Sequence, residues 1–113
     1  MNFLKLFRHP VALVDLTPDQ LLDRLSQQPV LVDVRTPGEY RAGHIDGAIS
    51  CPLGSEASLL VACPLDSDII LICKTGHRSQ AAADTLLGLG FRRVSHLQGG
   101  IGAWRRAGNP TLS

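Results

Sequence analysis

Short runs of apolar residues alternate along this chain with longer stretches in which apolar residues recur at helical spacing. Continuous apolar runs of this length are typical of strands that are buried on both faces of a sheet. The pattern predicts five strands, over residues 11–15, 30–34, 48–51, 68–73 and 91–97. The run at 68–73 gives the strongest signal, because an unbroken aliphatic stretch leads directly into Cys73.

The stretches between these runs carry the signals with which helices begin and end. Thr17 and Thr36 each precede a proline, which is typical of an N-cap followed by the first helical residue. Glu39 stands where a capping box with Thr36 needs it. Helices are expected over residues 18–28, 37–42, 56–62, 78–89 and 100–107.

Strands separated by helices predict an α/β fold, with one central, mainly parallel sheet of five strands and helices on both faces. The 113 residues suffice for one compact domain and are too few for two. We place this domain at residues 11–113. Residues 1–10 are expected to form an N-terminal tail, either an amphipathic surface turn or a frayed end, because Lys5 and Arg8 interrupt their apolar residues.

Composition and charge exclude several classes of protein. Hydrophobic residues make up 44% of the chain and charged residues 19%, which is ordinary for a soluble globular protein. The formal net charge of +1 gives no reason to expect binding to nucleic acid or to a membrane, and no apolar stretch would span a bilayer. The three cysteines (Cys51, Cys63 and Cys73) form no C-x-x-C pair, so no zinc site is expected. Their odd number favours a reducing compartment and hence a cytoplasmic location.

The candidate chemistry lies after the fourth predicted strand, where Cys73 opens a short loop that leads into a helix. In an open parallel sheet, ligands bind beyond the carboxyl ends of the strands. Loop amides and a helix N-terminus suit an anion there, and together with Lys74 and Arg78 they favour the thiolate form of Cys73. A thiolate beside an anion cradle is equipped to attack a negatively charged, sulfur-bearing donor.

The rest of this loop supplies candidate substrate-binding residues. Gly76 allows a backbone conformation that a Cβ would hinder, so that loop amides can approach the bound group. Ser79 is expected to cap the helix or to donate a hydrogen bond to the Cys73 sulfur. The other candidates supply hydrogen-bond donors or positive charge: Lys74, Thr75, His77 and Arg78. A cysteine that ends a buried strand is by itself typical of a core residue, but the polar residues crowded beside this one favour a functional site.

Three stretches, in order along the chain, resemble the signatures of the rhodanese-like family. Residues 73–79 (Cys-Lys-Thr-Gly-His-Arg-Ser) are similar to its active loop, C-x-x-G-x-R-S. Residues 31–49 resemble its upstream signature, with Leu-Val-Asp-Val-Arg, then Glu-Tyr, then Gly-His-Ile-Asp-Gly-Ala-Ile. Residues 97–110 resemble its closing signature, with Leu-Gln-Gly-Gly-Ile, then Ala-Trp, then Gly-Asn-Pro. The resemblance covers about residues 11–112.

This resemblance implies a single-domain enzyme, a thiosulfate sulfurtransferase, with Cys73 as its catalytic residue and no metal or organic cofactor. In the reaction best known for the family, the thiolate takes the outer sulfur of thiosulfate and sulfite leaves. The persulfide then passes its sulfur to cyanide or a thiol, in a ping-pong mechanism. The resemblance also implies that Asp33 and Arg35 lie near the pocket. We expect these two to tie strand ends to loops by ion pairing, with only a minor part in substrate contact.

Other residues of the three signatures are expected to be structural. His44 is interpreted as a hydrogen-bonded structural histidine and Trp104 as a core residue of the last helix. The Gly-Gly pair before that helix predicts a tight turn close to the site. Cys51 and Cys63 are expected to be inert thiols, unless one lies within disulfide reach of the active thiol.

Three other functions stay open from the sequence. A cysteine phosphatase or arsenate reductase also uses a thiolate in an anion loop, but its arginine typically lies one position farther from the cysteine than Arg78 lies from Cys73. The shorter loop suits one sulfur atom better than a phosphate. A non-catalytic binding module of the same fold is an alternative, although such modules often lack the cysteine. A persulfide relay that takes sulfur from a partner protein would use the same chemistry as an enzyme acting on small molecules.

Overall fold

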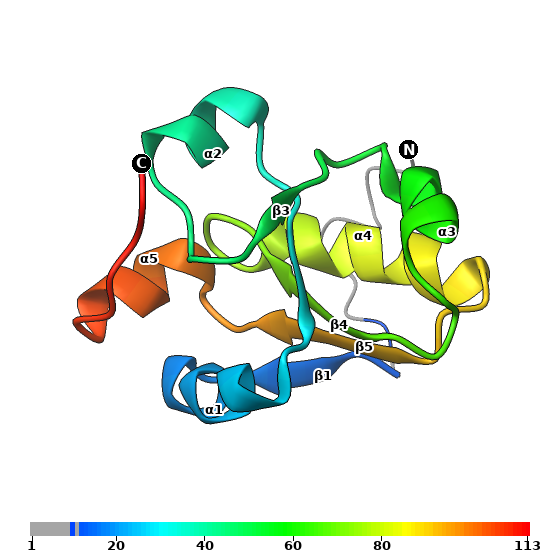
Figure 1. Ribbon diagram of the computed structural model, residues 1–113, viewed down its shortest axis with the longest axis horizontal. Helices are drawn as coiled ribbons and strands as arrows, with labels where there is room; N and C mark the ends of the chain where they lie inside the picture. The colour runs from blue at the N-terminus through cyan, green and yellow to red at the C-terminus, as the bar shows by residue number, and fades with distance from the viewer. Residues whose placement is uncertain (1–9, 11) are drawn as a thin grey trace.

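The computed structural model describes Pro10 and residues 12–113. Five strands form one sheet and helices connect them (Figure 1). The strands are β1 (Val14–Leu16), β2 (Val30–Asp33), β3 (Ile49–Ser50), β4 (Asp68–Ile72) and β5 (Arg93–Leu97). The helices are α1 (Pro18–Arg24), α2 (Pro37–Ala42), α3 (Leu59–Ala62), α4 (His77–Gly88) and α5 (Gly100–Arg106). Short 3-10 helices, η2 (Leu25–Gln27) and η3 (Glu56–Ser58), follow α1 and precede α3.

All neighbouring strands run parallel, in the order β1-β5-β4-β2-β3. Parallel neighbours require crossover connections, and the helices supply them. The predicted α/β class and five-stranded sheet are therefore confirmed, and the sheet is entirely rather than mainly parallel. Because β4 lies between β5 and β2, the loop that follows it opens at the middle of the sheet's carboxyl edge.

The strands are shorter than the stretches over which they were predicted. β5 begins at Arg93 rather than at Phe91, because Phe91 belongs to the turn after α4, where its N–H donates to the Leu86 carbonyl at 3.1 Å. Phe91 is nevertheless buried. A buried turn residue such as Phe91 therefore extends the predicted strand past the hydrogen-bonded one, although the two arginines that follow it are exposed. The predicted start of the first strand, at residue 11, lies outside the described residues.

Helices cover both faces of the sheet, as predicted, and alternate residues of β4 supply the two cores. Ile70 and Ile72 face one cluster together with α1 and α5, and Trp104 is its largest member. Ile69 and Leu71 face the other cluster, with α3 and α4. Burial of each such aliphatic side chain contributes about 2 kcal/mol relative to exposure. β4 is therefore fixed from both sides up to the residue before the loop.

The two predicted helix starts are capping boxes. Thr17 accepts from the Gln20 N–H at 3.2 Å, while its own N–H donates to Gln20 Oε1 at 2.9 Å. Thr36 and Glu39 make the same reciprocal pair, at 3.2 and 3.0 Å. A cap of this kind stabilises a helix by about 1 kcal/mol. The second box also fixes the direction of α2, which carries Glu39.

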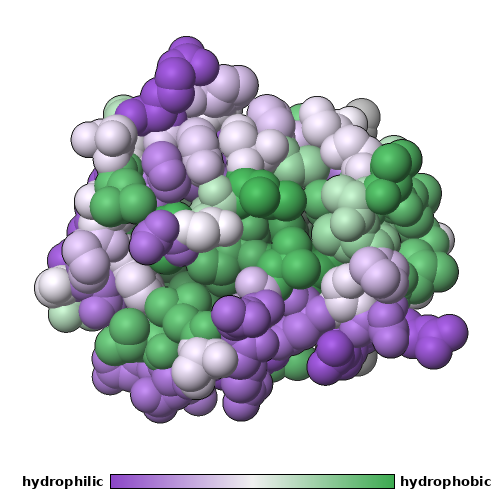
Figure 2. Space-filling view, viewed as in Figure 1, coloured by the Kyte–Doolittle hydropathy of each residue, from purple (hydrophilic) through white to green (hydrophobic). Residues whose placement is uncertain are grey.

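One stretch of hydrophobic surface lies over α3, on the right of the view in Figure 2. Its most exposed member is Val61, at 95%. Across the described part of the chain, the structure contains no helix of the length and hydrophobicity that a membrane crossing requires.

The tail predicted over residues 1–10 lies, apart from Pro10, outside the described residues. The boundary placed after residue 10 stays a prediction.

Candidate active site

Cys73 is the first residue after β4, and only 1% of it is exposed. Its Sγ atom lies 2.9 Å from the Gly76 N–H, which donates to it, and 3.5 Å from Ser79 Oγ. A thiolate accepts hydrogen bonds and donates none. The backbone donor of Gly76 therefore matches an anionic sulfur at this position.

Gly76 links the loop to α4 and is buried against the end of β5. It is the N-cap residue of the helix and adopts φ +100°, a left-handed conformation that favours glycine. A Cβ at this position would lie 3.3 Å from the Gly99 nitrogen. The Gly76 amide and the positive end of α4 thereby approach the sulfur.

The turn before α5 holds the Cys73 loop from the other side. The Ile101 N–H donates to the Cys73 carbonyl at 2.8 Å, and the Gly102 N–H donates to the Lys74 carbonyl at 3.2 Å. Gly100 has φ +63°, and a Cβ there would overlap both carbonyl groups. The Gly-Gly pair is thus a turn close to the site, as predicted, and also a direct contact with the loop.

Ser79 connects the sulfur to a buried histidine that the sequence analysis missed. Ser79 Oγ lies 3.1 Å from the Gly76 carbonyl and 2.7 Å from His96 Nδ1. His96 Nε2 in turn lies 2.6 Å from Asp15 Oδ1. The available signal was a histidine between Val94 and Leu97 in the predicted last strand, where a buried polar side chain needs a partner.

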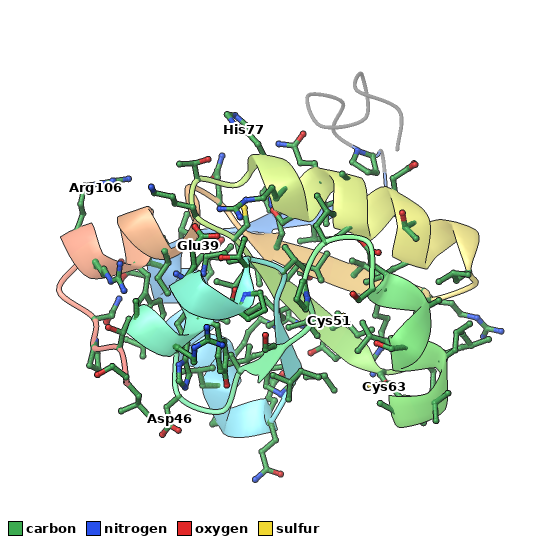
Figure 3. All side chains as sticks on the ribbon, turned by 90° about the horizontal axis from the view of Figure 1, so that it is seen from above. Glu39, Asp46, Cys51, Cys63, His77 and Arg106 are labelled. Carbon is green, nitrogen blue, oxygen red and sulfur yellow. The ribbon has the colours of Figure 1, made fainter. Side chains whose placement is uncertain are left out.

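The remaining loop residues divide between two small pockets on either side of the loop. Lys74 lines one, of about 190 Å³, together with Arg35, Glu39 and Arg105. Thr75 and His77 line the other, of about 130 Å³, which also includes Asp15, Gly76, His96 and Gln98. Lys74, Thr75 and His77 are exposed, and Figure 3 shows His77 projecting outward from the start of α4.

Arg78 is bound by a carboxylate from α2. Its two terminal nitrogens donate to the two Glu39 carboxylate oxygens at 2.7 and 3.0 Å. Figure 3 shows Glu39 on the face of α2 turned toward the loop before α4. This pairing lowers the pKa of Glu39 to about 2 and raises the pKa of Arg78. The sequence placed Arg78 at the substrate and gave Glu39 only its capping role, but the structure joins the two.

Known proteins resemble this chain over most of its length. The family model for the rhodanese-like domain matches residues 17–107. A thiosulfate sulfurtransferase GlpE of Pseudomonas entomophila is 38% identical over 90 residues, which cover 80% of this chain and 83% of the relative. A sulfurtransferase of Allochromatium vinosum is 35% identical over 88% of this chain and 94% of the relative.

The chain belongs to the rhodanese-like domain family.

Solved structures lead to the same result. The rhodanese-like domain of an Anabaena protein superimposes with a TM-score of 0.81 at 29% identity, over 88% of this chain and 78% of that one. The resemblance found in the three sequence signatures is therefore confirmed along nearly the whole chain.

Asp33 and Arg35 of this rhodanese-like domain are paired with each other. Arg35 Nη2 lies 2.7 Å from Asp33 Oδ2 and also donates to the Gly43 carbonyl at 2.7 Å. Both residues are buried. The pair ties the end of β2 to the loop after α2, which is the structural role that the sequence predicted. Arg35 also lines the pocket beside Lys74.

The Glu39–Arg78 pair predicts a pH dependence that the variant Glu39→Gln isolates, because glutamine keeps the capping box. A carboxyl group whose pKa falls from 4.5 to about 2 on folding stabilises the fold above 4.5, and this stabilisation is lost as the pH drops toward 2. At about pH 6 we expect the free energy of unfolding of the wild-type protein to exceed that of the variant by less than about 1 kcal/mol, because both side chains of the pair are partly exposed. Urea unfolding should show this difference closing below pH 4.5. A difference independent of pH would contradict it.

The other two cysteines lie apart from the loop contacts. Burial raises the pKa of Cys51, whose sulfur approaches the Ser55 carbonyl at 3.5 Å. Cys63 is partly buried, and both are free thiols (Figure 3). Among the described residues, no three histidine, cysteine, aspartate or glutamate side chains are grouped to hold a metal ion.

His44 and Trp104 have the structural roles that the sequence predicted. The His44 ring stacks on Tyr40 with 3.9 Å between ring centroids, and its Nδ1 lies 2.9 Å from the Tyr40 carbonyl. Trp104 is buried, and its indole N–H donates to the Pro110 carbonyl at 2.8 Å.

A larger cavity, of about 490 Å³, lies between α1 and α5 and is separate from the Cys73 loop. Its walls are mostly apolar, with Leu22, Leu31 and Trp104 among them, and no predicted site residue lines it. Because a charged sulfur donor needs polar partners, the two small pockets beside the loop are the better match for one.

Proposed function

We propose that this protein is a sulfurtransferase that takes a sulfane sulfur from thiosulfate or a similar donor and passes it to a thiol or to cyanide. Cys73 carries the sulfur as a persulfide, and the protein uses no cofactor. The relatives named as thiosulfate sulfurtransferases support this choice of donor.

The observation that carries the proposal is the contact between the Gly76 N–H and the Cys73 sulfur, 2.9 Å apart, at the N-terminus of α4. A buried thiol that only fills space needs no backbone donor aimed at it. A sulfur that bears negative charge does need one, both as the attacking thiolate and later as the persulfide anion.

In the first half-reaction the Cys73 thiolate attacks the outer sulfur of thiosulfate. A new S–S bond forms, the donor's own S–S bond breaks, and its electron pair leaves with sulfite. Total charge is conserved, because the persulfide carries the single negative charge that the thiolate had. In the second half-reaction an acceptor nucleophile takes the terminal sulfur, and the Cys73 thiolate is restored.

Lys74 supplies positive charge to the pocket in which the donor's sulfonate end would bind, and Arg105 lines the same pocket. Thr75 and His77 supply donors from the opposite side of the loop. Asp33 and Arg35 support the wall of the Lys74 pocket and have at most a minor part in contacting the donor. Gly76 and Ser79 act on the sulfur itself.

A phosphatase or arsenate reductase is a weaker proposal. Those enzymes need an arginine fork directed at a tetrahedral oxyanion. The corresponding fork here, on Arg78, binds both oxygens of Glu39. The loop is also the shorter one, with four residues between Cys73 and Arg78.

Two further candidate functions are a persulfide relay, which differs from this enzyme in the source of the sulfur, and a non-catalytic binding module, which uses the fold without the chemistry. A persulfide relay would receive sulfur from a partner protein through the same Cys73. A non-catalytic binding module would have no use for the cysteine and its backbone donor. The chemistry at Cys73 favours the first of these over the second.

The proposal is tested by incubating the folded protein with thiosulfate and measuring its mass. We expect one added sulfur atom, located on Cys73 by fragmentation and removed by cyanide. Mercaptopyruvate and a polysulfide, run in parallel, rank the donors. A folded protein that stays unmodified by thiosulfate would contradict the donor assignment, and modification by polysulfide alone would favour the relay. Turnover of an aryl phosphate without sulfur transfer would favour the phosphatase.

We place the protein in the cytoplasm. Three free thiols, one of which must stay reduced to act, suit a reducing compartment.

A further inference from the structure

A continuous chain of polar contacts runs from the Cys73 sulfur to a carboxylate on the far side of β5. It passes from Cys73 Sγ to Ser79 Oγ at 3.5 Å, then to His96 Nδ1 at 2.7 Å, and from His96 Nε2 to Asp15 Oδ1 at 2.6 Å. Each of the two shorter distances joins a proton donor to an acceptor. The chain therefore joins a buried sulfur to an acid through two groups that can both accept and give a proton.

The sheet register fixes this chain. Asp15 and His96 are directly opposite one another in the β1–β5 ladder, and Leu71 of β4 is opposite His96 on the other side. Cys73 lies two positions after Leu71, directly after the end of β4, so the sulfur and the imidazole stand at neighbouring strand ends. The His96 side chain is only 3% exposed, whereas that of Asp15 is 43% exposed. The series of polar contacts thus leads from the interior to the surface.

We propose that His96 and Asp15 are positioning residues that take up the proton of Cys73 through Ser79 and thereby keep its sulfur ionised. This inference deepens the proposed function, on which it rests, by naming the groups that prepare the nucleophile. His96 and Asp15 do not touch the sulfur, and Ser79 transmits their effect.

The proton of Cys73 reaches His96 by way of Ser79. In the thiol form, the Cys73 S–H donates to Ser79 Oγ, the Ser79 O–H donates to His96 Nδ1, and His96 Nε2–H donates to Asp15. The S–H and O–H bonds then break, and new O–H and Nδ1–H bonds form. The products are a thiolate and an imidazolium that Asp15 neutralises. No electron is exchanged, and Ser79 ends as it began, with its hydroxyl directed at the sulfur or at the Gly76 carbonyl, 3.1 Å away.

The charges around His96 favour this state. On the described elements that pack against it, the ionisable groups nearby are Asp15 on β1, Cys73 after β4 and His77 at the start of α4. Arg106 Nη2 of α5 lies 4.0 Å from the position that a Cβ on Gly99 would take, and Gly99 lines the same pocket as His96. Two of these groups are anionic in the proposed state, one on each side of the ring, and both attract an imidazolium.

The test measures the rate at which iodoacetamide alkylates Cys73 as a function of pH, with no sulfur donor present. Fragment masses assign the label to Cys73 rather than to Cys51 or Cys63. In His96→Asn the side-chain amide can still bond to Ser79 but cannot take up a proton. We expect alkylation at about pH 7 to slow by about tenfold, with the half-maximal rate at higher pH.

Asp15→Asn removes the charge at a partly exposed position. We expect it to slow alkylation at about pH 7 by about threefold and to move the half-maximal rate to higher pH, as in His96→Asn. His44→Asn is the matched control, because it makes the same change in a histidine that packs on Tyr40 and has no contact with Ser79 or Asp15. Its alkylation profile should coincide with that of the wild-type protein. If His96→Asn does not fold, Asp15→Asn decides the matter.

A folded Asp15→Asn protein with the wild-type profile would overturn the proposal. So would a profile of His96→Asn that is lowered at every pH without moving along the pH axis, because a merely structural role predicts that result. The persulfide measurement is independent of this one. Persulfide formation with unshifted alkylation profiles would remove His96 and Asp15 from the mechanism and leave the sulfurtransferase proposal intact. Shifted profiles without persulfide formation would keep the role of His96 and Asp15 and contradict the sulfurtransferase proposal.

Discussion

Replacing Cys73 with serine is expected to lower sulfur transfer by about a thousandfold or more while the domain stays folded. A hydroxyl group is not ionised at neutral pH and forms no persulfide, so both half-reactions stop. The serine oxygen can still accept from the Gly76 N–H and bond to Ser79, which limits the loss of stability to about 1 kcal/mol. Steady-state transfer from thiosulfate to cyanide measures the activity, and urea unfolding measures the stability.

Cys51→Ser is the matched control for this variant. Cys51 is also buried, at 4% exposure, but its sulfur contacts Ser55 and Ser58 rather than the loop. We expect this variant to keep its activity, and the same holds for Cys63→Ser. Loss of transfer in either folded control would give that thiol a resolving role, and retained transfer in Cys73→Ser would place the nucleophile elsewhere.

Gly100→Ala is expected to have the second largest effect, on stability and activity together. A Cβ at this position would overlap the backbone carbonyls of Cys73 and Lys74, and φ +63° already disfavours any side chain. Backbone groups cannot move aside as a flexible side chain can. We expect the free energy of unfolding to drop by about 2–4 kcal/mol. Displacement of the loop by about 1 Å would also reduce sulfur transfer by about a hundredfold.

Gly108→Ala separates the cost of the left-handed backbone conformation from the cost of the overlap with the Cys73 loop. Gly108 has a similar backbone conformation, with φ +87°, but nothing lies within 4 Å of its Cβ position. It should therefore show only the conformational cost, about 1 kcal/mol, with unchanged activity. Urea unfolding and the transfer assay, run on both variants, measure the difference. Equal losses in the two proteins would mean that the contact between Gly100 and the Cys73 loop has no effect of its own.

Local signals in the sequence predicted the elements well. Thr17 and Thr36 begin helices where the capping rules place them, and Ile69–Ile72 form the buried strand that their uninterrupted apolar character indicates. These features depend on neighbours within a few residues of one another. Strand ends were less accurate, because residues such as Phe91 pack on the core from a turn.

Contacts between distant segments could not be predicted in the same way. His96 and Asp15 lie 81 positions apart and meet only because β1 pairs with β5, the last strand, rather than with β2, which follows it in the chain. Glu39 and Arg78 are 39 positions apart, and both already had a local interpretation. Gly100 was assigned to a turn, and only the fold reveals what the turn touches.

The place of β5 in the sheet has a consequence for the protein as it is made. β5 pairs with both β1 and β4, and the turn after it supplies the two amides that hold the Cys73 and Lys74 carbonyls. A nascent chain that has emerged only as far as Cys73 contains the thiol but none of the groups from β5 or α5 that fix the loop. We therefore expect the loop to be fixed, and the sulfur to be linked to His96, only after β5 and α5 have emerged and folded beside β4, so that a chain made only as far as Cys73 carries an ordinary thiol.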